Sequence, residues 1–170
     1  MIERYSLEKM RNIWSDENKF SKMLQIEIVT CEALTAAKSM PYAALNRIKR
    51  KAKFNINRIN ALEKQTNHDV VAFLMNVAES LGKDAKFLHK GLTSSDILDT
   101  TLSLQLVESA DIILDGLRKL KNTLASKAKK YKNAVCIGRT HGVHAEPITL
   151  GLKFALWFDE INRSLGRMQQ

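Results

Sequence analysis

The chain of 170 residues is long enough for one domain with its own core, or for a small domain and the start of a second, so it needs no disulfide scaffold. Lysine and arginine (27) outnumber aspartate and glutamate (18), and the formal charge of +9 favours polyanions or small anionic substrates as partners. The sequence shows neither a signal peptide nor an apolar run of membrane-spanning length, which predicts a cytoplasmic protein without membrane partners.

Glycine and proline are scarce, with seven and two residues, and apolar residues elsewhere recur at the three- and four-residue spacing of helices. The sequence therefore predicts an all-α fold. Ser15 is expected to begin the second helix, Pro41 to lie in the first turn of the third, and Asn55 or Asn57 to cap the fourth. The helices before the longest one are expected at residues 6–14, 15–39, from 41, from 55 or 57 to about 65, and 69–81.

The longest predicted helix runs from Thr93 to Tyr131 and contains a single glycine. It would be about 58 Å long at the usual rise per residue. Alternating four- and three-residue spacing along it is typical of a helix-bundle seam, formed by Leu106, Ala110, Ile113, Leu117, Leu120 and Leu124. Only one further long helix follows, from about Pro147 to Met168. We therefore expect an N-terminal helical domain at 1–92 and the start of a bundle at 93–170, which other chains or further sequence must complete.

Two features have simple structural explanations. Cys31 and Cys136 form no CxxC pair and are expected to be buried as small hydrophobic side chains. The basic segments 47–53 and 127–132 are expected to be solvated helix faces, because aromatic residues, which usually accompany lysine and arginine in nucleic-acid sites, make up only 6% of the chain. A basic module that binds nucleic acid or a partner helix through these segments is the alternative hypothesis.

The four histidines, His68, His89, His141 and His144, lie at expected helix starts or in loops, and each is a candidate proton donor or acceptor. Thr66 approximates the spacing of a capping box with the acid three residues later, which would place His68 in the first helical turn. Such a histidine is either neutral and beside an anionic ligand or uninvolved in function.

Three consecutive hydroxyl residues, Thr93, Ser94 and Ser95, precede Asp96 at the start of the longest helix. The threonine-to-acid spacing again predicts a cap, and hydroxyls at a helix start can also bind a dicarboxylate.

The segment 136–151 is expected to be a loop in which Gly138 and Gly142 let the backbone approach a ligand and Pro147 restarts the helix. A zinc site at His141 and His144 is disfavoured, because no third ligand stands at a suitable spacing.

Taken in order, four segments resemble the aspartase, fumarase and argininosuccinate lyase superfamily, and within it the adenylosuccinate lyase family. They are residues 2–5, 67–73, 89–96 and 138–147, and the resemblance covers essentially the whole chain. Fumarases and argininosuccinate lyases usually carry a leucine-glutamine pair after the last motif's histidine. Gly142 and Val143 follow His141 here, which favours the purine enzyme.

The resemblance implies elimination of fumarate from adenylosuccinate, leaving AMP, and from the succinyl-carboxamide ribonucleotide of the same pathway, without cofactor or metal. It implies that His141 is the general acid and that His68 assists. His89 would have a peripheral or structural role, and His144 would lie behind the residues that contact substrate. The substrate-binding residues implied by the resemblance are Arg4, Tyr5, Asn67, His68, Asp69, Thr93, Ser94 and Thr140, with Arg4 and Tyr5 at the nucleotide phosphate and Thr93 and Ser94 at a carboxylate.

The family's serine-base loop, glycine-serine-serine-x-methionine-proline-x-lysine-x-asparagine, does not occur in these residues. Family active sites are assembled from three subunits of a homotetramer. We therefore expect this chain to be the N-terminal portion of such a lyase and to be inactive alone.

Overall fold

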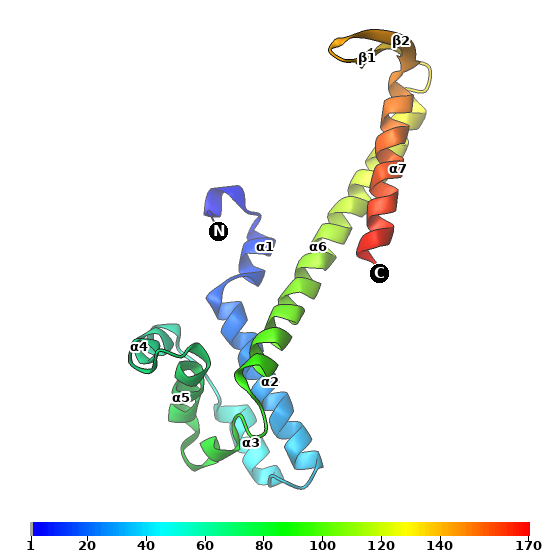
Figure 1. The fold of residues 1–170 in the computed structure, drawn as a ribbon. Helices are drawn as coiled ribbons and strands as arrows, with labels where there is room; N and C mark the ends of the chain where they lie inside the picture. Colours follow the sequence, from blue (N-terminus) through cyan, green and yellow to red (C-terminus); the bar gives the residue numbers. More distant parts are fainter. Residues whose placement is uncertain (1) are drawn as a thin grey trace. The chain divides into compact units, whose positions relative to one another are not determined.

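The computed structural model describes residues 2–170 and contains seven α-helices, two short 3-10 helices and one two-stranded sheet within that range (Figure 1). The chain forms two compact units, one ending at Glu108 and one comprising Ser109–Gln170. The division falls inside α6 (Ser94–Lys130), the long helix predicted from Thr93. The expected domains at 1–92 and 93–170 stay a prediction.

In the first unit the five predicted helices occur in the predicted order, as α1 (Glu8–Ile13), α2 (Asp16–Ala36), α3 (Tyr42–Lys51), α4 (Ile56–Thr66) and α5 (Asp69–Leu81), followed by the start of α6. Two 3-10 helices that were not predicted, η1 (Glu3–Tyr5) and η2 (Gly82–Phe87), precede α1 and follow α5. Ser15 caps α2 by accepting the N–H of Asn18 at 3.2 Å. Asn55, rather than Asn57, caps α4 by accepting the N–H of Arg58 at 2.9 Å. The predicted cap residues thus set the starts of α2 and α4. Pro41 directly precedes α3 as its N-cap instead of lying in its first turn.

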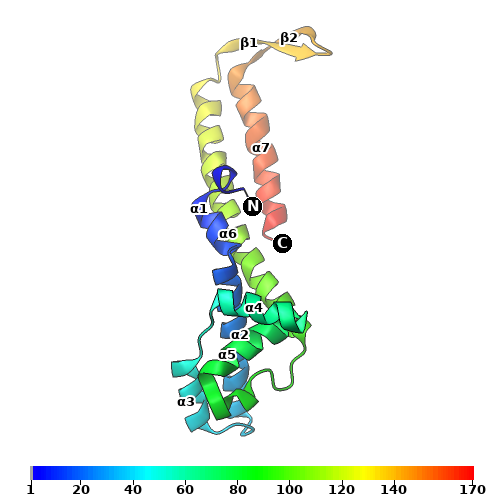
Figure 2. The same ribbon diagram turned by 90° about the vertical axis from the view of Figure 1, so that its left-hand side faces the viewer.

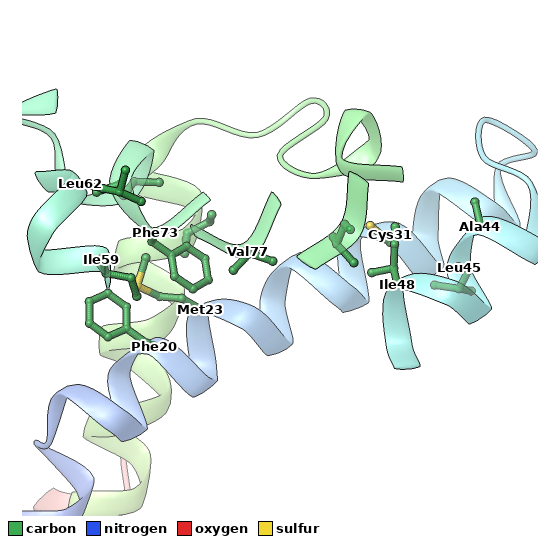
Figure 3. Close-up of a cluster of buried hydrophobic side chains, with 14 of the residues drawn as sticks. Phe20, Met23, Cys31, Ala44, Leu45, Ile48, Ile59, Leu62, Phe73 and Val77 are labelled. Carbon is green, nitrogen blue, oxygen red and sulfur yellow. The ribbon is translucent and has the colours of Figure 1, made fainter. Parts of the chain in front are cut away.

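The core of this unit is formed by helices α2 to α5, which pack their apolar faces together (Figure 3). The rings of Phe20 and Phe73 stack at 5.8 Å between centroids. Ile59 is fully buried near these rings, and Ile48 is fully buried near Cys31 (Figure 3). Cys31 is also fully buried, as predicted, and burial raises the pKa of its thiol to about 11, so the thiol stays protonated at neutral pH.

The second unit contains the rest of α6, strands β1 (Val135–Thr140) and β2 (Val143–Thr149), and α7 (Leu150–Met168). The strands pair antiparallel and connect α6 to α7 (Figure 2). The prediction of a loop at 136–151 is therefore wrong for the two strands that occupy most of the segment, and only the turn at 141–142 lies between them. β-Branched residues recur in these strands, and their partners lie across a tight turn. Cys136 lies on β1 and is half-buried, so the prediction of a buried thiol is wrong there.

The prediction that Pro147 restarts a helix is wrong. Pro147 lies in β2 opposite Ile137. A two-stranded ribbon consists of edge strands, which tolerate a residue without an N–H donor. Thr149 caps α7 instead, accepting the N–H of Leu152 at 3.2 Å. Across residues 2–170, none of the helices combines the length and apolar character needed to cross a bilayer.

The predicted seam on α6 is largely uncovered. Leu124 is buried, but Leu106, Ile113 and Leu120 are exposed. On α7, Leu152, Leu156 and Trp157 are exposed as well. Large apolar side chains in such numbers on long helices indicate surfaces that other elements or chains cover.

Candidate functional site

The turn between α4 and α5 positions Asn67, His68 and Asp69. Asn67 ends α4 in the left-handed conformation (φ 51°), which asparagine tolerates, and its N–H bonds to the carbonyl of Glu63 at 2.8 Å. His68 is the cap of α5, and its Nδ1 accepts the N–H of Val71 at 3.5 Å. A ring nitrogen that accepts a backbone N–H carries no proton, so a neutral His68 has its proton on Nε2.

The predicted capping box from Thr66 to Asp69 is wrong. Thr66 is the last residue of α4, and its hydroxyl oxygen accepts the N–H of His68 at 3.3 Å. Because Asn67 turns the chain sharply, the second helix begins too late for Thr66 to cap it. His68 consequently precedes the first helical turn instead of lying in it. The Asp69 carboxylate lies 3.6 Å from His68 Nδ1 and accepts the N–H of Val70 at 2.8 Å.

The turn at the start of α6 holds the predicted hydroxyl residues. Asp96 Oδ2 accepts the N–H of Thr93 at 2.7 Å and its hydroxyl at 3.2 Å, which confirms the capping interaction predicted from their spacing. Ser94 is half-buried and Ser95 is exposed. The Thr93 hydroxyl proton is thus engaged by Asp96, and a carboxylate ligand would have to take the place of that contact.

A buried carboxylate contacts His89, in the segment that leads to this turn, and was not among the predicted site residues. Glu27 in α2 is fully buried. Its Oε2 accepts the backbone N–H of His89 at 2.7 Å, and its Oε1 lies 2.9 Å from Nδ1 of the same residue. His89 has a positive φ of 56°. The sequence pattern could have indicated this contact. Glu27 lies between Met23 and Cys31 on the apolar face of its helix, where a carboxylate without a partner is costly in free energy.

The β1–β2 hairpin carries Thr140 and His141. Thr140 pairs with Val143, which leaves His141 (φ 51°) and Gly142 (φ 76°) as a two-residue turn in which both residues have positive φ. His141 is exposed at this tip. His144 lies on β2 opposite Arg139.

Gly138 was expected to let the backbone approach a ligand, but the structure gives a different reason for it. A Cβ atom at Gly138 would lie 2.8 Å from the carbonyl oxygen of Glu146, so the glycine permits a close approach by β2 at the irregular pairing between Ile137 and Arg139. The hairpin geometry therefore depends on this glycine.

The predicted site residues fall into two groups. The first unit holds three of the predicted segments, which are Asn67 to Asp69, Thr93 with Ser94, and Arg4 with Tyr5 in η1. Among residues 2–170, no hydrogen bond joins any of these segments to another. Arg4 lies with its guanidinium carbon 4.8 Å from the centre of the Tyr5 ring, and both side chains are exposed. The second unit holds Thr140 and His141. Within residues 2–170, no group of three or more histidine, cysteine, aspartate or glutamate side chains is placed to hold a metal ion.

Comparisons with known proteins place this chain among lyases. A family model described as "Lyase" matches residues 3–170. The chain is 49% identical over 170 residues to the adenylosuccinate lyase of Bacillus subtilis (strain 168) and 46% identical to that of Staphylococcus saprophyticus. Each alignment covers 100% of this chain and 39% of the relative, so the chain spans about two fifths of the length of these relatives.

Two solved structures share this fold at lower identity. A fumarate lyase from Mesorhizobium sp. BNC1 aligns with a TM-score of 0.89 and 26% identity, covering 95% of this chain and 39% of that structure. A 3-carboxy-cis,cis-muconate lactonizing enzyme from Pseudomonas putida aligns with a TM-score of 0.89 and 28% identity, covering 97% and 39%.

Proposed function

Because the chain belongs to this lyase family, we propose that it forms part of an enzyme that eliminates fumarate from adenylosuccinate, leaving AMP, and from the succinyl-carboxamide purine intermediate. The observation that carries the proposal is identity of 46–49% along the entire chain to relatives named adenylosuccinate lyase. The fumarate lyase and muconate lactonizing enzyme structures share only 26–28% identity, so the purine substrate is the better supported choice. The enzyme would act in the cytoplasm and use no cofactor.

The reaction requires one proton to leave carbon and one to reach nitrogen. A base takes the proton from the carbon next to a succinyl carboxylate, the electron pair forms the double bond of fumarate, and the carbon–nitrogen bond breaks. We assign His141 as the acid that protonates the departing nitrogen. Its place at an exposed two-residue turn supports this role, because the ring is accessible while the paired strands hold the backbone.

His68 is assigned an assisting role at the substrate. A neutral ring that accepts the Val71 N–H at Nδ1 has its Nε2–H available to donate a hydrogen bond. Asn67 and Asp69 flank it in the same turn and are assigned to substrate binding.

The remaining assigned residues bind the two ends of the substrate. Thr93 and Ser94 would bind a succinyl carboxylate in place of Asp96, and Thr140 would contact substrate beside the acid. Arg4 and Tyr5 are assigned to the nucleotide phosphate, where a guanidinium group and a phenolic hydroxyl can both donate hydrogen bonds.

No base is assigned among these residues. We propose that it comes from a part of the enzyme that corresponds to the uncovered three fifths of the relatives, and that the active enzyme is a homotetramer whose chains complete each site. The exposed apolar residues of α6 and α7 support such an assembly.

Complementation tests this proposal. The chain is mixed with a separately produced remainder of the Bacillus subtilis relative, and adenylosuccinate cleavage is followed by ultraviolet absorbance. Activity is expected on mixing, and His141→Asn should lower kcat by about 10²–10⁴-fold, the usual contribution of a general acid. Asparagine tolerates the positive φ of the turn, so this variant removes the acid without straining the hairpin.

His144→Asn is the matched control, because His144 lies on β2 of the same hairpin, three residues beyond His141. It should retain most of the activity. An absence of cleavage in the mixture, although the two parts associate, would count against the lyase assignment. Equal losses in both variants would count against His141 as the acid.

A further inference from the structure

A polar cleft of about 680 Å³ lies in the first unit, and none of the residues assigned to catalysis lines it. It is formed where α3 ends, α4 begins and α5 passes beside them. Three basic residues line it, Arg50, Lys51 and Lys53, together with Asn76 and Glu79. The proposed lyase reaction uses none of these side chains.

The basic segment 47–53 contains five lysine and arginine residues, and the three of them that form no ion pair in the part of the chain that the structure describes line the cleft. Arg47 donates two hydrogen bonds to Asp84, at 2.7 and 2.8 Å, and Lys49 pairs with Glu32. Neither Arg47 nor Lys49 lines the cleft. The three that do are exposed, and none of them has an acidic side chain within ion-pairing distance among residues 2–170.

The negative charge of Glu79, the acidic residue that lines the cleft, is already balanced by a pairing with Arg58. Arg58 donates two hydrogen bonds to its Oε1, at 2.9 and 2.6 Å, and this pairing holds the pKa of the Glu79 carboxyl below its usual value. Asn76 donates to the other oxygen at 3.2 Å. Since Glu79 is occupied in this way, it does not balance the three cations, and the cleft keeps a net positive charge.

Part of the cleft wall is held in place by contacts within the protein. Asn76 is buried, and its Oδ1 accepts the N–H of Asn55 at 2.7 Å, which ties the start of α4 to α5. Phe54, which also lines the cleft, packs against Phe20 in the core with 6.0 Å between ring centroids. A preformed wall lowers the entropic cost of ordering a ligand.

From this arrangement we propose that the cleft binds a small anion with two adjacent phosphate groups, of the pyrophosphate type. Three cations around one concavity match the charge of two phosphates better than that of one. Lysine and arginine are also the side chains that usually donate hydrogen bonds to phosphate groups. Nucleic acid fits less well. Its binding grooves follow many phosphates and offer aromatic faces to bases, whereas Phe54 is half-buried and engaged with Phe20.

Calorimetric titration of the intact chain with inorganic pyrophosphate tests the proposal. The double variant Arg50→Gln/Lys53→Gln should weaken binding by at least about tenfold, because each lost charge-assisted hydrogen bond commonly costs that factor. Both side chains are exposed, so the variant should keep the wild-type circular dichroism spectrum. Orthophosphate at equal ionic strength should bind at least about tenfold more weakly than pyrophosphate.

Lys130→Gln, in the second basic segment 127–132, is the matched control and should change the affinity by less than about twofold. Equal weakening in the control and the double variant would overturn the proposal, since it would indicate non-specific charge attraction. So would equal affinities for the two phosphate anions, no binding at millimolar pyrophosphate, or tighter binding of a single-stranded oligonucleotide through the same two residues.

Discussion

Single side chains connect segments that are far apart in the sequence, and Glu27 is the clearest case. Its carboxylate is fully buried and meets both the backbone N–H and the ring of His89, 62 residues later. His89 in turn accepts the N–H of Leu92 at 3.3 Å through its carbonyl, just before Thr93. The conformation of the segment entering α6 therefore depends on one carboxylate in α2.

Glu27→Gln tests this dependence. The amide has one accepting oxygen where the carboxylate has two, so the side chain at position 27 can no longer offer an accepting oxygen to both the backbone N–H and the ring of His89. We expect the free energy of unfolding to fall by about 1–3 kcal/mol, measured by urea denaturation. Glu32→Gln is the control, because Glu32 lies on the same helix, has a side chain that is 44% exposed, and pairs with Lys49. Its change should stay below about 1 kcal/mol, and similar losses in both variants would contradict the assigned role of Glu27.

At the scale of helices and strands, the pair Arg47–Asp84 connects α3 to η2. The two hydrogen bonds from Arg47, together with its positive charge, hold the pKa of the Asp84 carboxyl below its usual value. A lowered folded-state pKa stabilises the fold at pH values above the unfolded-state pKa, about 3.9 for aspartate, and this contribution disappears as the pH falls through the folded-state pKa.

Arg47→Gln should therefore lower the stability at pH 7, and its difference from the wild type should shrink below about pH 4. Urea denaturation at pH 7 and pH 3 measures both. Lys49→Gln is the control, since its ion pair with Glu32 is open to solvent, with side chains 45% and 44% exposed, and it should change little at either pH. A difference between Arg47→Gln and the wild type that stays constant across this range would show that Asp84 is not the responsible group.

The contact between α6 and α7 in the second unit depends on Gly151. A Cβ atom there would lie 2.6 Å from Lys132 Cα and 2.7 Å from the Ala128 carbonyl oxygen, so the two backbones are too close for a side chain. Gly151→Ala should lower the free energy of unfolding by about 1–3 kcal/mol, the usual effect of overpacking.

Gly116→Ala is the opposite case and serves as control. Gly116 lies inside α6 with open space around it, so alanine should stabilise the helix by about 0.5–1 kcal/mol. Thermal unfolding followed by circular dichroism would show the two shifts in opposite directions. Stabilisation by both substitutions would mean that helix propensity, rather than the helix contact, determines the effect at Gly151.

For the whole molecule, the uncovered apolar residues of α6 predict self-association. Ile113 and Leu120 are exposed on the predicted seam, and burying such side chains contributes about 25 cal/mol per Å² of apolar surface. Sedimentation velocity should show concentration-dependent oligomers, and Ile113→Glu/Leu120→Glu should shift the population toward monomer. Arg118→Glu, on an exposed position of the same helix, should not. A chain that stays monomeric at all concentrations would contradict the seam interpretation.

Local sequence alone determined most of the helical structure. The predicted helix from Asp69 to Leu81 agrees with α5 at both ends, and the predicted 93–131 helix agrees with α6 to within one residue. Capping side chains and stop signals lie within a few residues of these ends, so the information is local. The family could also be identified at this level, because its motifs are short segments of consecutive residues.

Tertiary structure alone decided what depends on distant partners. The β1–β2 hairpin required two strands to pair, and the same segment without that pairing had been predicted as a loop. The roles of Glu27 and Asp84 depend on side chains 62 and 37 residues away. The basic segment 47–53 was predicted to be one solvated face. In the structure two of its cations form ion pairs and the other three line a cleft. Helical periodicity describes neighbours along the chain, whereas charge compensation and strand pairing depend on which segments meet in space.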